Sequence, residues 1–503
     1  MRKGDVIELK IENLAFGGAG IGRVDKEGGK IVVFVENALP GDVVMVEIDE
    51  LKRNYAAGFV KEFVSKSAER VEARCPHFGA AVATEIRERT AGALASAGGA
   101  KHVFDRKKNC GGCRWQDLAY DRQLFYKTEQ VREILVRLGG FSPEVVRPIL
   151  GLKDPWFYRN KMEFSFAYTP WNGLELGLHM KGRRHDLTLI DECFLMQPFV
   201  GSFVARSREF FRGVFEDHEL KTHNYAPKRG GVYKGLQSLT VRRGFRTGEI
   251  MVILNVENIE VDFEEDFVKM VREFFAENSK QGDALVSIIL TQFFNVKGTP
   301  KKKVEKVLWG KEFYEEILHL PEGGELKFEV AAQAFFQPNS QQAEALYAIA
   351  LEAAGLTGAE VAYDLCCGTG TIGMFAAKWA ARVFGVEMEA SAVRNAKQNA
   401  ALNHIKNIEF FEGDVKKILP TLPEKADVIL VDPPRAGLHE DVVATIGRSG
   451  AERVVYISCN PTTLARDLKI LVELGYELEF VQPVDQFCHT YHIECVAKLV
   501  RAK

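Results

Sequence analysis

The chain lacks any apolar run that approaches the roughly 20 residues a membrane-spanning helix needs. It also lacks the start of a secretory signal, because its first residues, Met1-Arg-Lys-Gly-Asp-Val-Ile7, introduce charge before an apolar segment could form. These two absences predict a soluble, cytoplasmic protein with no membrane partner. We expect it to be a monomer.

The chain also lacks the excess of basic residues that is usual in a dedicated nucleic-acid-binding module, since 66 Lys and Arg stand against 69 Asp and Glu. The charge is unevenly distributed, however. Residues 101–190 contain 16 Lys and Arg against 10 Asp and Glu. Such a stretch fits a phosphate backbone, but it fits a solvated surface equally well, so charge alone does not decide whether the protein binds RNA.

Disulfide bonds are not expected either. The chain has nine cysteines, and in a cytoplasmic protein cysteines are more often ligands, nucleophiles or buried apolar side chains than disulfide partners. Each cysteine therefore needs its own explanation.

The length of 503 residues is too great for one hydrophobic core, and at about 100 to 200 residues per domain it predicts about three domains. In residues 1–63, short runs of alternating apolar and polar residues are separated by turn signals such as Gly17, Gly18 and Pro40-Gly41. Short strands between turns predict a small β-barrel, an architecture that often binds RNA. This segment resembles the TRAM domain, a barrel found on RNA-modifying enzymes; the alternative is a structural appendage.

Residues 64–330 are predicted to form a central domain of α+β character, with β-rich runs at 250–255 and 285–291. Within it, an Ala- and Gly-rich stretch occupies about 80–109. Small residues bury too little surface to fold by themselves, so we expect a flexible insertion there.

Residues 331–503 alternate strand-like apolar runs with helical stretches. The runs lie at 361–365, 381–386, 428–431 and 454–458. This alternation is typical of a parallel, doubly wound sheet, so the predicted fold class is α/β with a Rossmann-like C-terminal domain. Ligands of such sheets bind at the carboxyl ends of the strands.

The first of these strands runs into a glycine-rich turn, Cys366-Cys-Gly-Thr-Gly-Thr-Ile-Gly373, where the backbone can approach a ligand at a helix N-terminus. The glycines match a dinucleotide fingerprint, and NAD is one candidate ligand. Acidic residues at the next strand ends favour a nucleoside instead. Glu387 can bind the ribose hydroxyls and Asp414 the adenine amino group, and no second phosphate cradle is evident. S-adenosylmethionine therefore fits the pattern better than NAD.

A stiff turn, Asp432-Pro-Pro-Arg-Ala-Gly-Leu438, follows the run at 428–431. Methyltransferases that act on amino groups place an aromatic residue after the prolines, and cytosine-5 RNA methyltransferases place a cysteine nucleophile in this turn. Arg435 follows the prolines here, so neither signature is present.

Cys459 follows the run at 454–458, and Asn460-Pro461 ends that strand sharply, which should expose the thiol at the same edge. Carbon 5 of uracil is not nucleophilic, but addition of a thiolate at carbon 6 gives an enolate whose carbon 5 can attack a methyl donor. A base must then remove the carbon 5 proton, and Glu494 in Cys488-His-Thr-Tyr-His-Ile-Glu494 is the candidate. The alternative for both residues is a structural role.

Five segments together resemble the RNA uracil-5 methyltransferase family: Phe335-Phe-Gln-Pro-Asn339, Asp364-Leu-Cys-Cys-Gly368, Asp432-Pro-Pro-Arg-Ala-Gly-Leu438, Ser458-Cys-Asn-Pro461 and His489-Thr-Tyr-His-Ile-Glu494. The resemblance covers nearly the whole chain. It implies that Cys459 is the nucleophile and Glu494 the proton acceptor. It also implies donor or uracil contacts by Gln337, Cys366, Thr371, Glu387, Asp414 and Asp432. The family usually has an aromatic residue at 366 and often Asn at 371, so Cys366 and Thr371 depart from its pattern.

Four further cysteines, enough for a cluster or a zinc site, are Cys75, Cys110, Cys113 and Cys193. In the ribosomal-RNA branch of the family, similar segments hold a 4Fe-4S cluster, with the first cysteine close to the Cys-Gly-Gly-Cys pair. Here the insertion lengthens that loop, which costs little entropy. The resemblance implies a 4Fe-4S cluster, with zinc and unligated thiols as alternatives.

The predicted function is methylation of carbon 5 of a uridine in RNA by S-adenosylmethionine. The barrel and the cysteine cluster together favour 23S ribosomal RNA as the substrate, and uridine 54 of tRNA is the alternative. An RNA-binding or assembly protein that has lost catalysis is an alternative of another class. The presence of both Cys459 and Glu494 argues against it.

Overall fold

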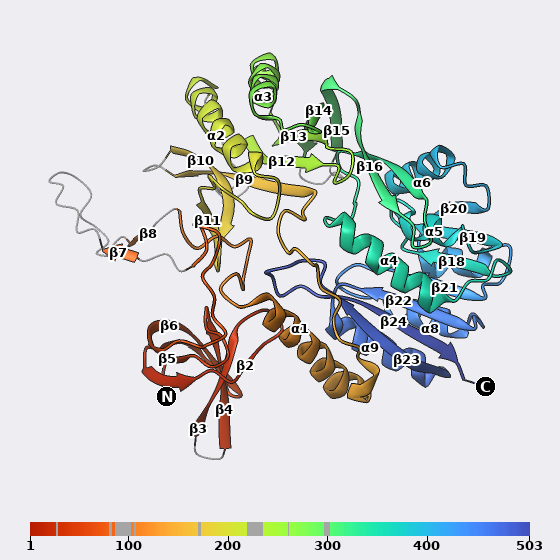
Figure 1. The fold of residues 1–503 in the computed structure, drawn as a ribbon, viewed down its shortest axis with the longest axis horizontal. Helices are drawn as coiled ribbons and strands as arrows, with labels where there is room; N and C mark the ends of the chain where they lie inside the picture. Colours follow the sequence, from red (N-terminus) through yellow and green to blue (C-terminus); the bar gives the residue numbers. More distant parts are fainter. Residues whose placement is uncertain are drawn as a thin grey trace.

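The computed structural model describes residues 1–26, 29–79, 83–85, 102–104, 107–169, 173–218, 235–259, 261–295 and 302–502. Most of the insertion expected at about 80–109 lies outside these residues; two short strands of it, β7 (Ala83–Glu85) and β8 (His102–Phe104), pair with each other. The described chain contains an N-terminal curled sheet, a central sheet and a C-terminal sheet (Figure 1).

The N-terminal sheet has the strand order β1-β5-β6-β4-β3-β2. Its strands are β1 (Val6–Lys10), β2 (Asn13–Leu14), β3 (Gly20–Lys26), β4 (Gly29–Glu36), β5 (Val43–Leu51) and β6 (Tyr55–Ser65). The alternating pattern of the sequence places Val33, Val35, Val44 and Val46 in a fully buried interior. The sheet curls so that β3 packs closely against β1. A Cβ added to Gly22 of β3 would lie only 2.6 Å from Leu9 Cγ of β1, too close for any side chain. Glycine at this position therefore permits closure.

The central sheet has the order β11-β10-β9-β12-β13-β14-β15. Its strands are β9 (Lys161–Thr169), β10 (Gly173–Met180), β11 (Arg183–Thr188), β12 (Gly235–Arg243), β13 (Glu249–Glu257), β14 (Ala284–Phe294) and β15 (Lys302–Gly310). Helices α2 (Phe199–His218) and α3 (Glu264–Asn278) lie on the same face of it (Figure 1). Their phenylalanines, including Phe203 and Phe274 with ring centroids 5.1 Å apart, form the core beneath.

The C-terminal sheet has the order β20-β19-β18-β21-β22-β24-β23. Its strands are β18 (Val361–Leu365), β19 (Arg382–Glu387), β20 (Ile408–Glu412), β21 (Val428–Val431), β22 (Arg453–Ser458), β23 (Tyr476–Val484) and β24 (Glu494–Arg501). The helices are α4 (Ser340–Ala354), α5 (Thr371–Ala376), α6 (Ala390–Leu402), α7 (Val415–Ile418), α8 (Glu440–Arg448) and α9 (Pro461–Glu473). Strands β18 to β22 are parallel, as the sequence predicts, whereas β24 runs antiparallel to both β22 and β23. The strand order reverses between β18 and β21, which is where a ligand crevice forms in such sheets.

Helix α1 (Tyr120–Ile134) connects the N-terminal sheet to the C-terminal one. Gln130 donates to the carbonyls of Leu14 and Ala15 at 3.2 and 3.1 Å, while Val131 lies in the same apolar core as Leu464 of α9. Figure 1 shows α1 between the curled sheet and α9. This helix falls in the range predicted for the central domain, and it packs against α9, a helix of the C-terminal part.

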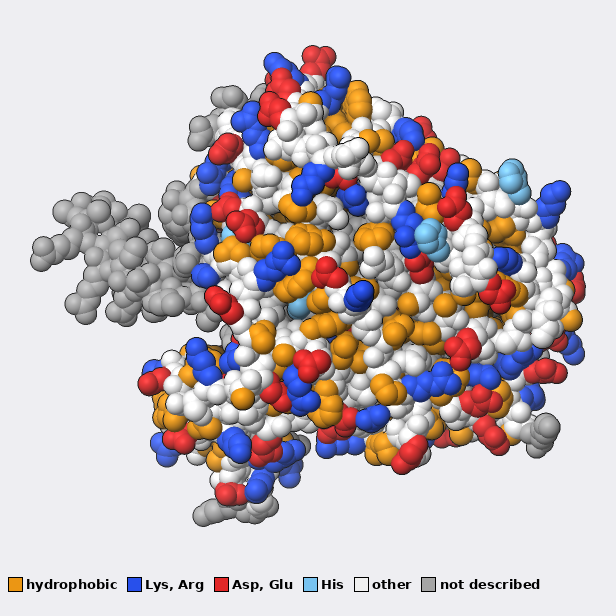
Figure 2. Space-filling model, in the orientation of Figure 1, with side chains coloured by type: hydrophobic (Ala, Val, Ile, Leu, Met, Phe, Trp, Pro, Cys, Tyr) orange, Lys and Arg blue, Asp and Glu red, His pale blue; other side chains and the backbone are white. Residues whose placement is uncertain are grey.

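Shorter elements complete the described fold: a β-hairpin of β16 (Phe313–His319) and β17 (Glu325–Ala331), and the short helices η1 (Leu135–Gly139), η2 (Pro143–Val145) and η3 (Leu419–Thr421). No helix in the described ranges has the length and apolar character to cross a membrane. Figure 2 shows acidic and basic side chains interspersed over the visible face, in line with the net charge of −3.

Candidate active site

A cavity of about 620 Å³ lies where five neighbouring strands of the C-terminal sheet end. Its walls include all the residues for which the sequence predicts a donor-binding or catalytic role: Gln337, Cys366, Thr371, Glu387, Asp414, Asp432, Cys459 and Glu494. The sheet explains this convergence, because the carboxyl ends of parallel strands meet at one edge.

The glycine-rich turn between β18 and α5 presents its backbone to this cavity. Cys366 adopts a left-handed conformation with φ of 59°, and Gly370 follows with φ of 76°. A Cβ on Gly370 would lie 2.6 Å from the ring of Phe410, so the turn can be this tight only with glycine there. Thr371 begins α5, and its hydroxyl lies 3.3 Å from that of Thr369.

Two carboxylates on the wall are held by backbone N–H groups. Glu387 Oε2 accepts from Gly368 at 2.9 Å, and its Oε1 accepts from Met388 and Glu389 at 2.8 and 2.9 Å. Asp414 caps α7 by accepting from the backbone of Lys416 at 2.9 Å. These bonds fix both carboxylates before any ligand arrives.

Two further carboxyl groups near the cavity, those of Asp364 and Asp432, have raised pKa values. Asp364 Oδ2 accepts from Gly373 N at 2.7 Å, whereas its buried Oδ1 has no hydrogen-bond partner among the described residues. Burial, and then the nearby Asp432 and Glu387, raise the pKa of Asp364 to about 8 despite that hydrogen bond. Burial raises the pKa of Asp432 to about 7. The cavity is therefore rich in carboxyl groups and suits a cationic ligand better than a pyrophosphate.

The pairing of β22 with β24 places Cys459 and Glu494 side by side. Ser458 lies opposite Cys495 in this antiparallel ladder, so the next position outward on each strand brings Cys459 opposite Glu494. Burial, followed by the charges of Glu494 and Asp432, raises the pKa of Cys459 to about 11, while Arg435 acts to lower it. The resting thiol is thus protonated at neutral pH.

Glu494 is almost fully buried, at 4% exposure. Burial raises its pKa well above the usual range, Asp432 raises it further, and Arg435 opposes both. A carboxylate with a raised pKa is a stronger base than one in water.

Gln337 joins the cavity to the central part of the chain. Its backbone carbonyl accepts from Asn160 Nδ2 at 2.8 Å, and its side-chain Oε1 accepts from Gln486 at 3.3 Å. The cavity also includes Phe487 and Tyr347, which the sequence analysis did not single out. Phe487 directly precedes the segment Cys488-His-Thr-Tyr-His-Ile-Glu494, and this proximity is the sequence signal that could have pointed to it.

The four remaining candidate cysteines, Cys75, Cys110, Cys113 and Cys193, line a second, small cavity with mostly apolar walls. Cys110 Sγ accepts a hydrogen bond from Gly112 N at 3.4 Å, and Cys113 Sγ accepts one from Gln116 Nε2 at 3.1 Å. Among the described residues, no group of three or more His, Cys, Asp or Glu is arranged to hold a single metal ion. Four thiols at one cavity are the donor set that a thiolate-bound group takes. Burial raises the pKa of each of the four thiols, and the N–H groups that reach Cys110 and Cys113 oppose that rise.

Comparison with known sequences identifies relatives along the whole chain. The profile of the tRNA (Uracil-5-)-methyltransferase family matches residues 267–415 and 423–502, and that of the TRAM domain matches residues 2–61. A protein of Halalkalibacterium halodurans named as an uncharacterized RNA methyltransferase is 36% identical over 99% of this chain and 98% of its own length. One of Clostridium acetobutylicum, similarly named, is 32% identical over 100% of this chain and 98% of its own.

Among solved structures, the Pyrococcus abyssi tRNA (uracil-54, C5)-methyltransferase in complex with S-adenosyl-L-homocysteine matches with a TM-score of 0.67 and 24% identity. The match covers 98% of this chain and 100% of that one. It confirms the predicted α/β fold with its Rossmann-like C-terminal part. The chain therefore belongs to the tRNA (uracil-5-)-methyltransferase family and is an RNA methyltransferase.

Proposed function

We propose that this enzyme methylates carbon 5 of a uridine in RNA through a covalent bond between Cys459 and carbon 6 of the base. The observation that carries the proposal is the position of Cys459 opposite Glu494, inside the cavity that also holds the donor-binding candidates. A nucleophile, a base and a donor site within one cavity are what uracil methylation at carbon 5 requires.

The donor is bound by groups at the ends of β18, β19 and β20. Glu387 takes the ribose hydroxyls, and Asp414 takes the adenine amino group. Gln337, Cys366 and Thr371 supply further contacts, and Asp432 lies where donor and uracil meet. When bound, S-adenosylmethionine supplies a methyl group on a positively charged sulfonium, and the carboxyl-rich wall stabilises that charge.

The reaction begins when the thiol of Cys459 has lost its proton to water. The sulfur adds to carbon 6, and the electron pair of the double bond between carbons 5 and 6 moves to the carbonyl oxygen at carbon 4. Carbon 5 of this enolate takes the methyl group as the donor's carbon–sulfur bond breaks. Glu494 then removes the carbon 5 proton, the double bond forms again, and the bond from carbon 6 to Cys459 breaks.

The RNA substrate has two candidates. We propose 23S ribosomal RNA because the barrel and the four-cysteine site occur together in this chain. Uridine 54 of tRNA is the second candidate, since the Pyrococcus abyssi enzyme named for that nucleotide matches the chain from the barrel to the catalytic sheet. The barrel by itself therefore does not distinguish the two.

We also propose that Cys75, Cys110, Cys113 and Cys193 hold a 4Fe-4S cluster. Support comes from their convergence on one small cavity and from the N–H groups that donate to the sulfurs of Cys110 and Cys113. When bound, such a cluster would cross-link three distant segments of the chain.

Replacement of the base gives the most direct test of the mechanism. Glu494→Gln should still add to uracil and transfer methyl, but turnover should fall by a factor of about 100 or more because the carbon 5 proton is no longer removed. A protein–RNA adduct that survives denaturing electrophoresis should accumulate. Cys459→Ala, the control, should form no adduct and no product while it binds the donor normally. Normal turnover by Glu494→Gln without an adduct contradicts the assignment of the base.

Donor affinity should depend on pH through Asp432. With a pKa of about 7, this carboxyl is mostly ionised above neutral pH and mostly protonated below it. The ionised form attracts the sulfonium, so affinity for S-adenosylmethionine should rise from pH 6 to pH 8, by at most about tenfold per pH unit, and then level off. Calorimetric titration should show a smaller change for S-adenosyl-L-homocysteine, which lacks that charge. Persistence of the same pH dependence in Asp432→Asn would rule out this explanation.

The metal content tests the cysteine site. Protein purified without oxygen should be brown and should contain about four irons per chain, as a four-cysteine cluster requires. Cys110→Ser should lose the iron, whereas Cys495→Ser, a buried cysteine outside this cavity, should keep it. Zinc in place of iron refutes the cluster, and iron retained by Cys110→Ser refutes the ligand set.

A further inference from the structure

The loop between β23 and β24 connects the active-site cavity to helix α1. Phe487 of this loop lines the cavity, and so does Glu494, the first residue of β24, which directly follows the loop. The turn between them is closed by its own hydrogen bonds, because Thr490 Oγ1 donates to the carbonyl of Phe487 at 2.8 Å and accepts from His492 N at 3.2 Å. The loop should therefore move as one piece. Because Glu494 directly follows the loop, contacts that hold the loop also influence the position of Glu494.

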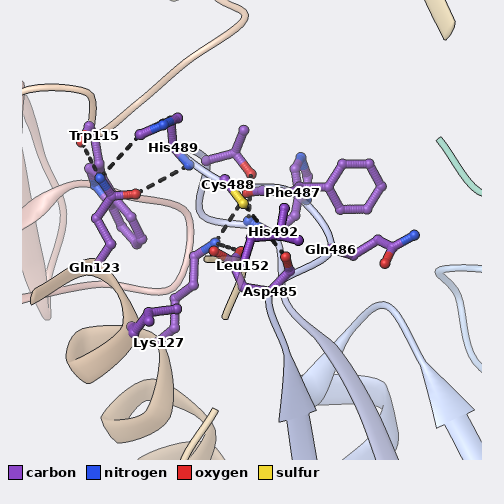
Figure 3. Close-up of polar contacts among 12 residues, drawn as sticks. Trp115, Gln123, Lys127, Leu152, Asp485, Gln486, Phe487, Cys488, His489 and His492 are labelled. Carbon is purple, nitrogen blue, oxygen red and sulfur yellow. Dashed lines mark hydrogen bonds and ion pairs between the residues drawn. The ribbon is translucent and has the colours of Figure 1, made fainter. Parts of the chain in front are cut away.

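Gln123 of α1 holds this loop at His489 (Figure 3). Gln123 is fully buried, and its Oε1 accepts from the backbone N–H of His489 at 3.1 Å while its Nε2 lies 3.2 Å from Nδ1 of the same residue. The same Nε2 donates to the carbonyls of Trp115 and Leu118, both at 2.8 Å. The Gln123 side chain thus binds the loop through His489, and its bonds to Trp115 and Leu118 fix the orientation of its amide group.

Lys127, one helical turn further along α1, holds the loop at a second place. Its ammonium lies 2.5 Å from Asp485 Oδ1 and donates to the carbonyl of Phe487 at 3.2 Å. Both charged side chains are completely buried, with 0% exposure. A buried ion pair is weak evidence for stability, since apolar residues of similar volume often stabilise a core at least as well. A positioning role accounts for the placement of these charges better than stability does.

His489 needs this support because its backbone is in a left-handed conformation, with φ of 63°, that is uncommon for residues other than glycine. Its carbonyl accepts from the backbone N–H groups of Arg114 and Trp115 at 2.7 and 3.1 Å. Its ring stacks on Trp156 with centroids 4.0 Å apart. Arg114 and Trp115 directly follow Cys113, which lines the cysteine cavity, so the segment after Cys113 holds the loop whose Phe487 lines the active site.

We infer that Gln123 and Lys127 are positioning residues for Glu494, and that Gln123, through His489, joins the segment that follows Cys113 to the base of the reaction. This inference rests on the proposed function. Neither residue touches the cavity that holds donor and base. Their effect is on the geometry of proton removal, and a displacement of about 1 Å at a reacting group can lower a rate about 100-fold.

The test compares two substitutions on α1. Gln123→Leu removes the contacts to His489. Gln130→Leu is the matched control, because Gln130 is also buried on the same helix but binds the barrel carbonyls of Leu14 and Ala15. Both full-length variants are assayed with ribosomal RNA and tRNA from cells that lack the gene.

Gln123→Leu should lower kcat about 10- to 100-fold, leave the KM for S-adenosylmethionine within about twofold, and accumulate the covalent protein–RNA adduct, because methyl transfer precedes the impaired step. Gln130→Leu should show no adduct and nearly normal kcat. A Gln123→Leu enzyme that behaves like Gln130→Leu, or that loses donor affinity in proportion to kcat without adduct, overturns the inference.

Gln123→Glu provides a second measurement if Gln123→Leu does not fold. It keeps the acceptor for His489 N and should show a smaller loss of kcat with the same adduct; normal kcat without adduct would overturn the inference. Failure of the proposed function is visible separately, as the absence of any adduct from Glu494→Gln. The absence of that adduct would contradict the proposed function and this inference together. An adduct from Glu494→Gln, combined with normal release of RNA by the Gln123 variants, would contradict the positioning role alone.

Discussion

The antiparallel ladder between β22 and β24 is the constraint on which the rest of the site depends. It brings Glu494 opposite Cys459, and no local property of either segment could do so. The parallel strands then supply the donor side of the same cavity, since their carboxyl ends lie along the edge from which Cys459 projects. In the proposed mechanism the chemistry is divided accordingly: the parallel part of the sheet binds the methyl donor, and the antiparallel end brings the proposed base, Glu494, to the proposed nucleophile, Cys459.

Electrostatics sets the resting state of this cavity. Burial raises the pKa values of Asp432 to about 7 and Cys459 to about 11, and it raises that of Glu494 as well. An empty site with this composition disfavours further negative charge, including the thiolate. Arrival of a cationic donor reverses that preference, because a positive sulfonium favours the ionised forms of its neighbours. Donor binding should therefore precede formation of the thiolate, which protects the enzyme from unproductive addition to RNA.

The site residues that could be predicted from the sequence are those whose positions depend on short local patterns. The strand ends at Glu387, Asp432 and Cys459 could be predicted from apolar runs and turn residues, because a parallel sheet collects its carboxyl ends at one edge. The antiparallel pairing of β22 with β24 could not be predicted, since no local sequence pattern specifies which strands pair or in which register. The contacts of α1 with this loop could not be predicted from the sequence either, because Gln123 and His489 are 366 residues apart. The count of basic residues at 101–190 overstates the charge available to RNA, because several of these cations are paired within the protein, in the pairs Lys127–Asp485, Arg114–Glu36 and Arg122–Glu69.

We propose above all that this cavity makes 5-methyluridine in RNA. The most direct measurement uses the purified enzyme, S-adenosylmethionine with a labelled methyl group, and total RNA from cells that lack the gene, followed by nucleoside analysis of separated ribosomal RNA and tRNA. We expect label in 5-methyluridine, in 23S ribosomal RNA rather than tRNA, and no label with Cys459→Ala. Label in tRNA alone would replace the proposed substrate and leave the chemistry in place. Label in any other nucleoside, or transfer by Cys459→Ala, would contradict the claim.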